Sequence, residues 1–144
     1  MIMKYTSLLF LLIFLSCSDS TVNQKIHDSN IPFLGNWTRS FELGKDSIQH
    51  ASYRIFKDSI EYEMFGTMAV KYVIKKDTFI AKDNRWIGKM HDNVYVIFIK
   101  NNNEKTITLL KKQVKDKNEA LYMQMPSDTA RSHFTSWNIY KKEN

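Results

Sequence analysis

Cys17 is the one cysteine in this chain of 144 residues, and it stands where an apolar run ends and a polar stretch begins. A thiol can serve as a redox centre, a nucleophile, a metal ligand or one half of a disulfide, and a disulfide within the chain needs a second cysteine. The apolar run covers residues 8–15, follows Lys4 and precedes the small Ser16. It is too short to cross a membrane, which takes about 20 apolar residues, and it has the layout of a secretory signal.

The four residues that end at this cysteine, Phe14-Leu15-Ser16-Cys17, resemble the lipobox of bacterial lipoprotein precursors, with Phe14 in place of the usual leucine. The resemblance implies that Cys17 carries a diacylglyceryl group and becomes the first residue of the mature chain. Two or more acyl chains anchor a protein stably on a bilayer. We therefore expect a lipoprotein of the bacterial cell envelope, anchored to the outer membrane on its periplasmic or surface side. An ordinary cleaved signal, with Cys17 left free or removed, is the alternative.

The expected organisation has three parts. Residues 1–16 form the signal peptide, and residues 17–30 form the lipidated N-terminus and a flexible tether, because 18–30 are polar and show no period. Residues 31–144 form one domain, since the 128 residues that follow the signal suit a single core.

Other groups of reactive side chains show no catalytic or metal-binding pattern. Glu61 and Glu63 share a strand face, and they fit a charge-paired exterior better than a catalytic pair. The chain has no P-loop, nucleophile-elbow or C-x-x-C motif, so we predict that it is not an enzyme and uses no cofactor. No metal site is expected either, because the histidines lack the close spacing of zinc ligands. These histidines are His27, His50, His91 and His133.

The net charge of +6 comes from lysines scattered over turns and strands, so no nucleic-acid partner is expected.

Alternation of apolar and polar residues with period two dominates from residue 31 onward, which is typical of strands. Short turn signals rich in Asn, Asp and Gly separate the candidate strands, and this spacing predicts consecutive antiparallel hairpins. A meander of this kind closes to remove its edges, so the prediction is an all-β antiparallel barrel, with a β-sandwich as the alternative. The ten candidate strands are 36–43, 49–56, 59–65, 68–75, 78–82, 85–90, 93–100, 105–112, 119–125 and 133–141.

The strand 119–125 is made of good helix formers, but it is short and Pro126 follows at once, so a strand is predicted, with one helical turn over 126–131. The strand over 94–99 is apolar on both faces and needs a cover outside the barrel, for which we expect either residues 31–34 or a second copy of the chain.

Arg39 falls on the apolar face of the first strand, together with Trp37 and Phe41. A lone guanidinium inside a barrel is costly unless it is paired. A ligand carboxylate or phosphate would pair with it well. The alternatives are a bulge that turns Arg39 outward, or neutralisation by one of the glutamates at positions 42, 61 and 63.

The segment Phe33-Leu-Gly-Asn-Trp37 resembles the G-x-W signature of lipocalins and their calycin relatives, with Gly35 and Trp37 at the matching positions. The resemblance implies an up-and-down barrel of eight to ten strands that holds one small apolar ligand, with the tryptophan closing its floor. In that family an arginine near the end of the last strand packs over the tryptophan, and Lys141 and Lys142 are the nearest cations here.

The function expected from these observations is a membrane-anchored lipocalin-like protein that binds a small amphiphile, a lipid or an apolar ligand. The expected ligand-binding residues are Trp37, Arg39, Phe41, Tyr62, Tyr72 and Trp86. The alternative is a packed barrel that grips an envelope protein or a second copy of itself, as an inhibitor or assembly factor. It depends on the doubly apolar strand 94–99, with Tyr95 facing outward.

Overall fold

The computed structural model describes residues 31–129, 131–132 and 135–144. The predicted signal peptide, the lipidation of Cys17 and the predicted tether therefore lie outside the described residues.

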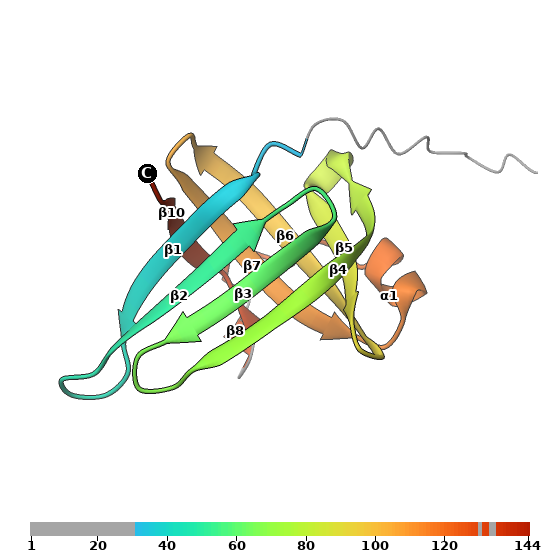
Figure 1. Cartoon of the computed structure of the whole chain (residues 1–144). Coiled ribbons are helices and arrows are strands. Elements are labelled where there is room, and N and C mark those ends of the chain that lie inside the picture. Colours follow the sequence, from blue (N-terminus) through green and yellow to red (C-terminus); the bar gives the residue numbers. More distant parts are fainter. Residues whose placement is uncertain (1–30, 130, 133–134) are drawn as a thin grey trace, which may run out of the picture.

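Eight antiparallel strands close into a barrel in the order β1-β10-β7-β6-β5-β4-β3-β2 (Figure 1). The predicted all-β up-and-down barrel is thereby confirmed, and the β-sandwich is not the fold. Closure gives every strand of this sheet a neighbour on both sides, and the shortest pairing is that of β1 with β10, at Trp37↔Lys142 and Thr38↔Lys141. The barrel strands are β1 (Gly35–Glu42), β2 (Ile48–Ile55), β3 (Ser59–Phe65), β4 (Val70–Ile80), β5 (Arg85–Met90), β6 (Asn93–Asn103), β7 (Thr106–Val114) and β10 (Asn138–Lys142). The remaining elements are η1 (Ala81–Asp83), α1 (Lys117–Tyr122) and a hairpin of β8 (Arg131–Ser132) and β9 (Thr135–Ser136).

β4 joins two strands that were predicted to be separate, 68–75 and 78–82. Lys76 and Asp77 do not form a turn, because the pairing with β5 only shifts register between Lys76 and Thr78. A bulge of this kind adds one residue to a continuous strand and interrupts the alternation of its side chains. In a sequence, that interruption is hard to distinguish from a turn.

The predicted strand over 119–125 is wrong, because α1 covers most of it. Asp116 caps the helix: its side chain accepts a hydrogen bond of 2.9 Å from the backbone N–H of Glu119. The Glu119 side chain in turn accepts one of 2.8 Å from the backbone N–H of Lys115. Such a capping pair, ahead of good helix formers, favours a helix locally. The predicted helical turn over 126–131 is also wrong where it is described, since 126–129 contain no helix.

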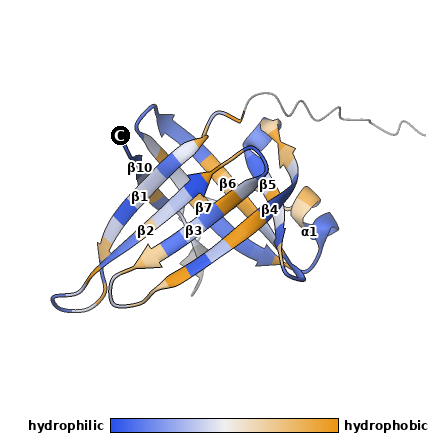
Figure 2. Cartoon of the chain, viewed as in Figure 1, coloured by the Kyte–Doolittle hydropathy of each residue, from blue (hydrophilic) through white to orange (hydrophobic). Residues whose placement is uncertain are grey.

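The barrel wall separates two apolar layers, in keeping with the bands of hydrophobic and hydrophilic residues along the strands in Figure 2. The inner layer includes Tyr95, Ile97 and Ile99 of β6. The outer layer contains Val94, Val96 and Phe98 of the same strand, packed with Ala120 of α1 and with the partly buried Ile80, Leu121, Met123 and Trp137. The strand 94–99 is thus covered from outside, as its composition requires.

The cover is not the predicted one. Ile31 and Phe33 are buried in the inner layer, so the segment 31–34 does not lie over the outer face of β6. Within the described chain, α1 and the residues around it take that place. Tyr95 faces the interior, contrary to the outward orientation on which the protein-binding alternative depended.

Among the described residues, no helix has the length and apolar character that a membrane crossing requires.

Candidate functional site

One end of the barrel interior is filled by side chains. Trp37 is buried there, and its indole Nε1–H donates a hydrogen bond of 2.7 Å to the carbonyl of Phe33. The Lys142 ammonium lies 5.7 Å from the centroid of the Trp37 ring. Trp86 is fully buried in the same layer. Both tryptophans belong to this packed region and neither lines the cavity described next.

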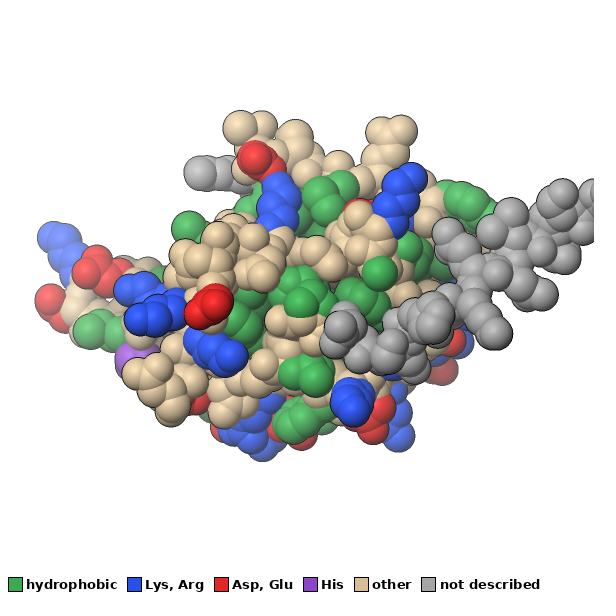
Figure 3. All heavy atoms as spheres, turned by 90° about the horizontal axis from the view of Figure 1, so that it is seen from above, with side chains coloured by type: hydrophobic (Ala, Val, Ile, Leu, Met, Phe, Trp, Pro, Cys, Tyr) green, Lys and Arg blue, Asp and Glu red, His purple; other side chains and the backbone are tan. Residues whose placement is uncertain are grey.

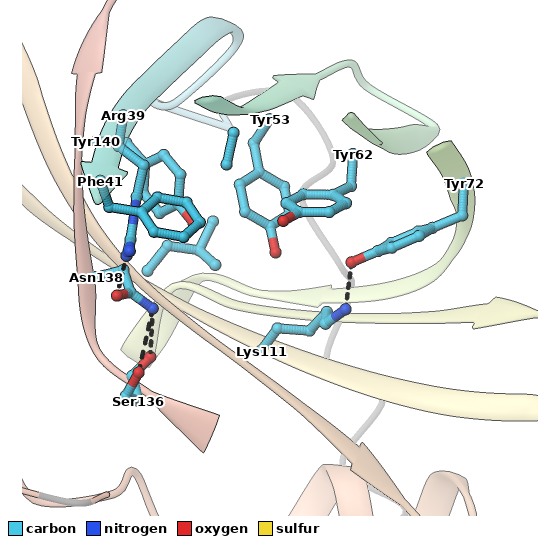
Figure 4. Close-up of a pocket in the computed structure, with 11 residues that line it drawn as sticks. Arg39, Phe41, Tyr53, Tyr62, Tyr72, Lys111, Ser136, Asn138 and Tyr140 are labelled. Carbon is cyan, nitrogen blue, oxygen red and sulfur yellow. Dashed lines mark hydrogen bonds between the residues drawn. The ribbon is translucent and has the colours of Figure 1, made fainter. Parts of the chain in front are cut away.

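A cavity of about 250 Å³ opens at the other end of the barrel, where the loops 43–47 and 66–69 project. Its walls come from six strands and from β9, because inward-facing residues of each strand meet there (Figure 4). Four of the expected ligand-binding residues, Arg39, Phe41, Tyr62 and Tyr72, line it. The other lining residues are Ala51, Tyr53, Leu109, Lys111, Ser136, Asn138 and Tyr140.

Four tyrosines form a continuous row across this cavity. The ring centroids of Tyr140 and Tyr53 are 5.1 Å apart in an edge-to-face contact, and those of Tyr53 and Tyr62 are 4.8 Å apart. Tyr62 and Tyr72 are stacked at 4.8 Å. Contacts of this kind stabilise each ring in one orientation, so the cavity has a firm aromatic wall.

Burial raises the pKa of all four phenols in this row. For Tyr53 the neighbouring phenols Tyr140, Tyr72 and Tyr62 raise it further. For Tyr140 and Tyr62, Arg39 opposes the rise caused by burial, because a nearby cation favours the phenolate. Burial is also the main cause at Tyr72. The row is therefore a neutral hydrogen-bonding surface at ordinary pH.

Arg39 points into the cavity, as the alternation of β1 predicts. Its guanidinium donates a hydrogen bond to Oδ1 of Asn138, and the Asn138 amide donates to the Ser136 carbonyl at 3.1 Å. The guanidinium carbon also lies 4.4 Å from the centroid of the Phe41 ring. These groups hold and orient the cation without neutralising its charge.

None of the three glutamates considered as partners for Arg39 lines the cavity. Glu61 and Glu63 lie on the outer face of β3, where Arg54 pairs with them at 3.4 Å and 3.0 Å. Glu42 is exposed at the end of β1. No acidic side chain occurs among the described residues that line the cavity.

Lys111 is a second cation in the same cavity, which the residue pattern of its strand did not predict. Its ammonium donates a hydrogen bond to the Tyr72 hydroxyl, across the barrel from β7 to β4 (Figure 4). It lies 4.3 Å from the Tyr72 ring centroid and 5.5 Å from those of Tyr62 and Tyr95. Burial disfavours the ammonium and lowers the pKa of Lys111 to about 8.

The mouth of the cavity carries exposed apolar side chains. They lie on the loops 43–47 and 66–69 and on the strand ends beside them: Leu43, Ile48, Phe65, Met68 and Val70. The buried side chain of Gln49 holds the second loop in place, since its carbonyl oxygen accepts hydrogen bonds of 3.0 Å and 3.3 Å from the backbone of Thr67 and Met68. An apolar rim thus lies on one side of the polar cavity, whereas Phe65 stacks on His50, with ring centroids 5.0 Å apart, on the outer face of the barrel.

No cluster of metal-ligating side chains occurs in the part of the chain that the structure describes. Seen from above, basic and acidic side chains mix with hydrophobic ones, and the residues drawn in colour form no continuous basic stripe on this face (Figure 3).

Comparison of the chain with protein-family models, with curated proteins and with solved structures finds no match.

Proposed function

We propose that this chain is a lipid-anchored binding protein of a bacterial envelope, and that its barrel takes up the carboxylate or phosphate end of a small amphiphile. The observation that carries the proposal is the pair of cations, Arg39 and Lys111, in one tyrosine-lined cavity without an acidic side chain among its described lining residues.

A charge that leaves water loses solvation free energy unless an opposite charge replaces the water. Arg39 and Lys111 have hydrogen-bond acceptors in Asn138 and Tyr72, but both acceptors are neutral. An anionic group between the two cations would supply the missing charge. The planar fork of an arginine suits carboxylate and phosphate oxygens in particular, because it presents two parallel N–H donors.

The volume of the cavity limits what it can hold. Pockets that enclose a whole drug-sized ligand measure about 300–1,000 Å³, and this one measures about 250 Å³. It therefore accommodates a compact anion or the polar end of a longer molecule. The exposed Leu43, Met68 and Val70 beside the mouth would contact the apolar remainder of such a molecule.

The proposed location rests on the sequence around Cys17. A lone cysteine directly after a short apolar run and a small residue is the pattern of a lipidated precursor, and it is difficult to explain otherwise in an exported protein.

The packing of α1 against the outer layer takes away the exposed apolar strand that favoured a protein-binding barrel, so we do not propose that alternative.

Calorimetric titration of the purified full chain with decanoate, and with decan-1-ol as the uncharged analogue, tests the proposal. Decanoate should bind and decan-1-ol should bind at least about tenfold more weakly. Arg39→Gln and Lys111→Met should each weaken decanoate binding by about tenfold to a hundredfold, since a hydrogen bond to a charged group contributes about 1.5–3 kcal/mol.

Lys112→Met is the matched control, because Lys112 pairs with Val96 and so faces the outside of the same strand. It should leave decanoate binding unchanged. Equal affinity for the acid and the alcohol, or equal losses in the Lys111 and Lys112 variants, would contradict an anion site in the barrel.

A further inference from the structure

Lys111 and Lys112 are consecutive lysines of β7 with opposite surroundings. Lys111 faces the cavity, where its Nζ is hydrogen bonded to the Tyr72 hydroxyl and lies within 5.5 Å of the ring centroids of Tyr62 and Tyr95. Lys112 is on the opposite face of the strand, paired with Val96 of the outer layer. The two side chains therefore provide a comparison of the same amine inside and outside the barrel.

An amine in the position of Lys111 has a chemistry that a surface lysine lacks. With a pKa of about 8, about half of Lys111 is neutral at pH 8, against about 0.3% of a lysine at the ordinary value of 10.5. The neutral amine is the form that adds to a carbonyl group. The Tyr72 hydroxyl, already bonded to Nζ, is placed to pass a proton during such an addition.

We infer that Lys111 is a carbonyl-reactive lysine, which forms a reversible imine with a small aldehyde or ketone held in the cavity, and that a carboxylate on the same molecule pairs with Arg39. The Nζ lone pair attacks the carbonyl carbon, and one amine proton passes to the carbonyl oxygen to give a carbinolamine. The carbinolamine then loses its hydroxyl group together with the second amine proton as water, and C=N replaces C=O. No oxidant or reductant takes part, and water reverses the step. The imine at Lys111 is a property beyond the proposed binding of an anion. The contact between the carboxylate and Arg39 rests on that proposed function.

The dimensions and lining of the cavity define the class of molecule. A volume of about 250 Å³ accommodates one substituted aromatic ring, and the rings of Tyr53, Tyr62 and Tyr72 offer it stacking partners. A ligand for this cavity needs a carbonyl group for Lys111, a carboxylate for Arg39 and a body that stacks on the tyrosines. A compact oxo acid with a planar or aromatic body meets these three requirements. 4-Carboxybenzaldehyde is a suitable probe, and benzaldehyde is its uncharged analogue.

The test is reductive trapping on the purified, folded full chain. Each aldehyde is incubated with the protein and cyanoborohydride at pH 8, and the labelling of every lysine is measured by peptide mass spectrometry. Lys111 should be labelled at least about tenfold more than Lys112 by either probe. This preference should disappear when the protein is unfolded in urea before labelling, because the burial that sets the Lys111 amine apart is then lost.

Lys111→Arg should remove the excess label, and Lys112→Arg should leave it unchanged. Equal labelling of Lys111 and Lys112 in the folded protein overturns the imine. Arg39→Gln should reduce labelling by 4-carboxybenzaldehyde by about tenfold and leave labelling by benzaldehyde as it was. If Lys111 is preferred by benzaldehyde and Arg39→Gln changes neither probe, the imine stands and the carboxylate contact fails, so the inference and the proposed function are tested separately.

Discussion

Two properties of Lys111 change in opposite directions with pH. As the pH rises, the charge that attracts an anion is lost, and the fraction of neutral amine that can add to a carbonyl group increases. Below about pH 8 its ammonium carries a charge that attracts an anion, and above that pH the charge is lost because burial has lowered the pKa. The titratable and charged groups that share its surroundings are Tyr62, Tyr72 and Tyr95 at its ring contacts, with Tyr53, Tyr140 and Arg39 elsewhere on the cavity wall. Burial raises the pKa values of Tyr53, Tyr62, Tyr72 and Tyr140, so these four phenols stay neutral in this range.

We expect decanoate affinity to fall by about fivefold or more between pH 7 and pH 9.5, since the lost contact involves a charged donor. The free energy of unfolding of the free protein should move the other way. Between about pH 8 and the ordinary lysine value of 10.5, the unfolded chain keeps a proton that folded Lys111 has released, so stability rises with pH. Titration calorimetry and urea unfolding across this range measure the two effects, and Lys111→Met should abolish both. A decanoate affinity that stays constant over this pH range would contradict the role given to the ammonium.

A buried arginine of the barrel holds the C-terminal end of α1, in addition to the apolar contacts of the helix and an ion pair of 2.8 Å between Lys117 and Asp77 of β4. Arg85 of β5 is buried on the outer face, where its guanidinium donates hydrogen bonds of 2.8 Å and 2.6 Å to the carbonyls of Ala120 and Leu121. The same guanidinium pairs with Asp83 and lies 5.0 Å from the centroid of the Phe98 ring. A cation is favourable at the C-terminal end of a helix, where carbonyls lack partners within the helix.

Arg85→Met should therefore lower the free energy of unfolding by about 3 kcal/mol, because it leaves Asp83 without its partner and the helix carbonyls without donors. Urea denaturation of the full chain measures this. Arg54→Met provides the comparison: Arg54 pairs with two glutamates on the outer face, but its side chain is 40% exposed, so the expected loss is below about 1 kcal/mol. Similar losses in the two variants would show that Arg85 does not hold α1 to the barrel.

The whole molecule has a packed half, with Trp37 and Trp86, and a hollow half with the cavity and its apolar rim. If the chain is anchored through Cys17, diffusion is confined to the membrane surface, and a ligand with an acyl or aromatic tail is concentrated in the same layer. The anchor would then keep the cavity close to the membrane layer in which its ligand is concentrated.

Metabolic labelling with palmitate tests the anchor. The expressed chain should incorporate the label, and Cys17→Ser should lose it completely, because the sequence contains no other thiol. Ser20→Ala, close by in the polar stretch, should keep it. A labelled Cys17→Ser variant, or an unlabelled wild-type chain that still carries residues 1–16, would contradict the lipoprotein assignment.

The barrel fold and part of the cavity lining can be predicted from the alternation of apolar and polar residues along single strands. Alternation along β1, β3 and β4 places Arg39, Phe41, Tyr62 and Tyr72 on inward faces, because side chains of a strand point alternately to its two sides. In β7 the same signal is present but ambiguous. Leu109 and Leu110 are both apolar and Lys111 and Lys112 are both basic, so the two faces look alike until their neighbours are known.

Contacts between distant segments settle what those patterns leave open. Tyr72 of β4 is hydrogen bonded to Lys111 across the barrel, so Lys111, unlike Lys112, is an interior group. α1 covers the outer face of β6, so both faces of this apolar strand are buried. Similarly, Trp37 and Trp86 are inward-facing, but the packing of Phe33 and its neighbours fills the space around them. A periodic pattern specifies which way a side chain points, whereas the space and charge in front of it depend on every strand that closes the barrel.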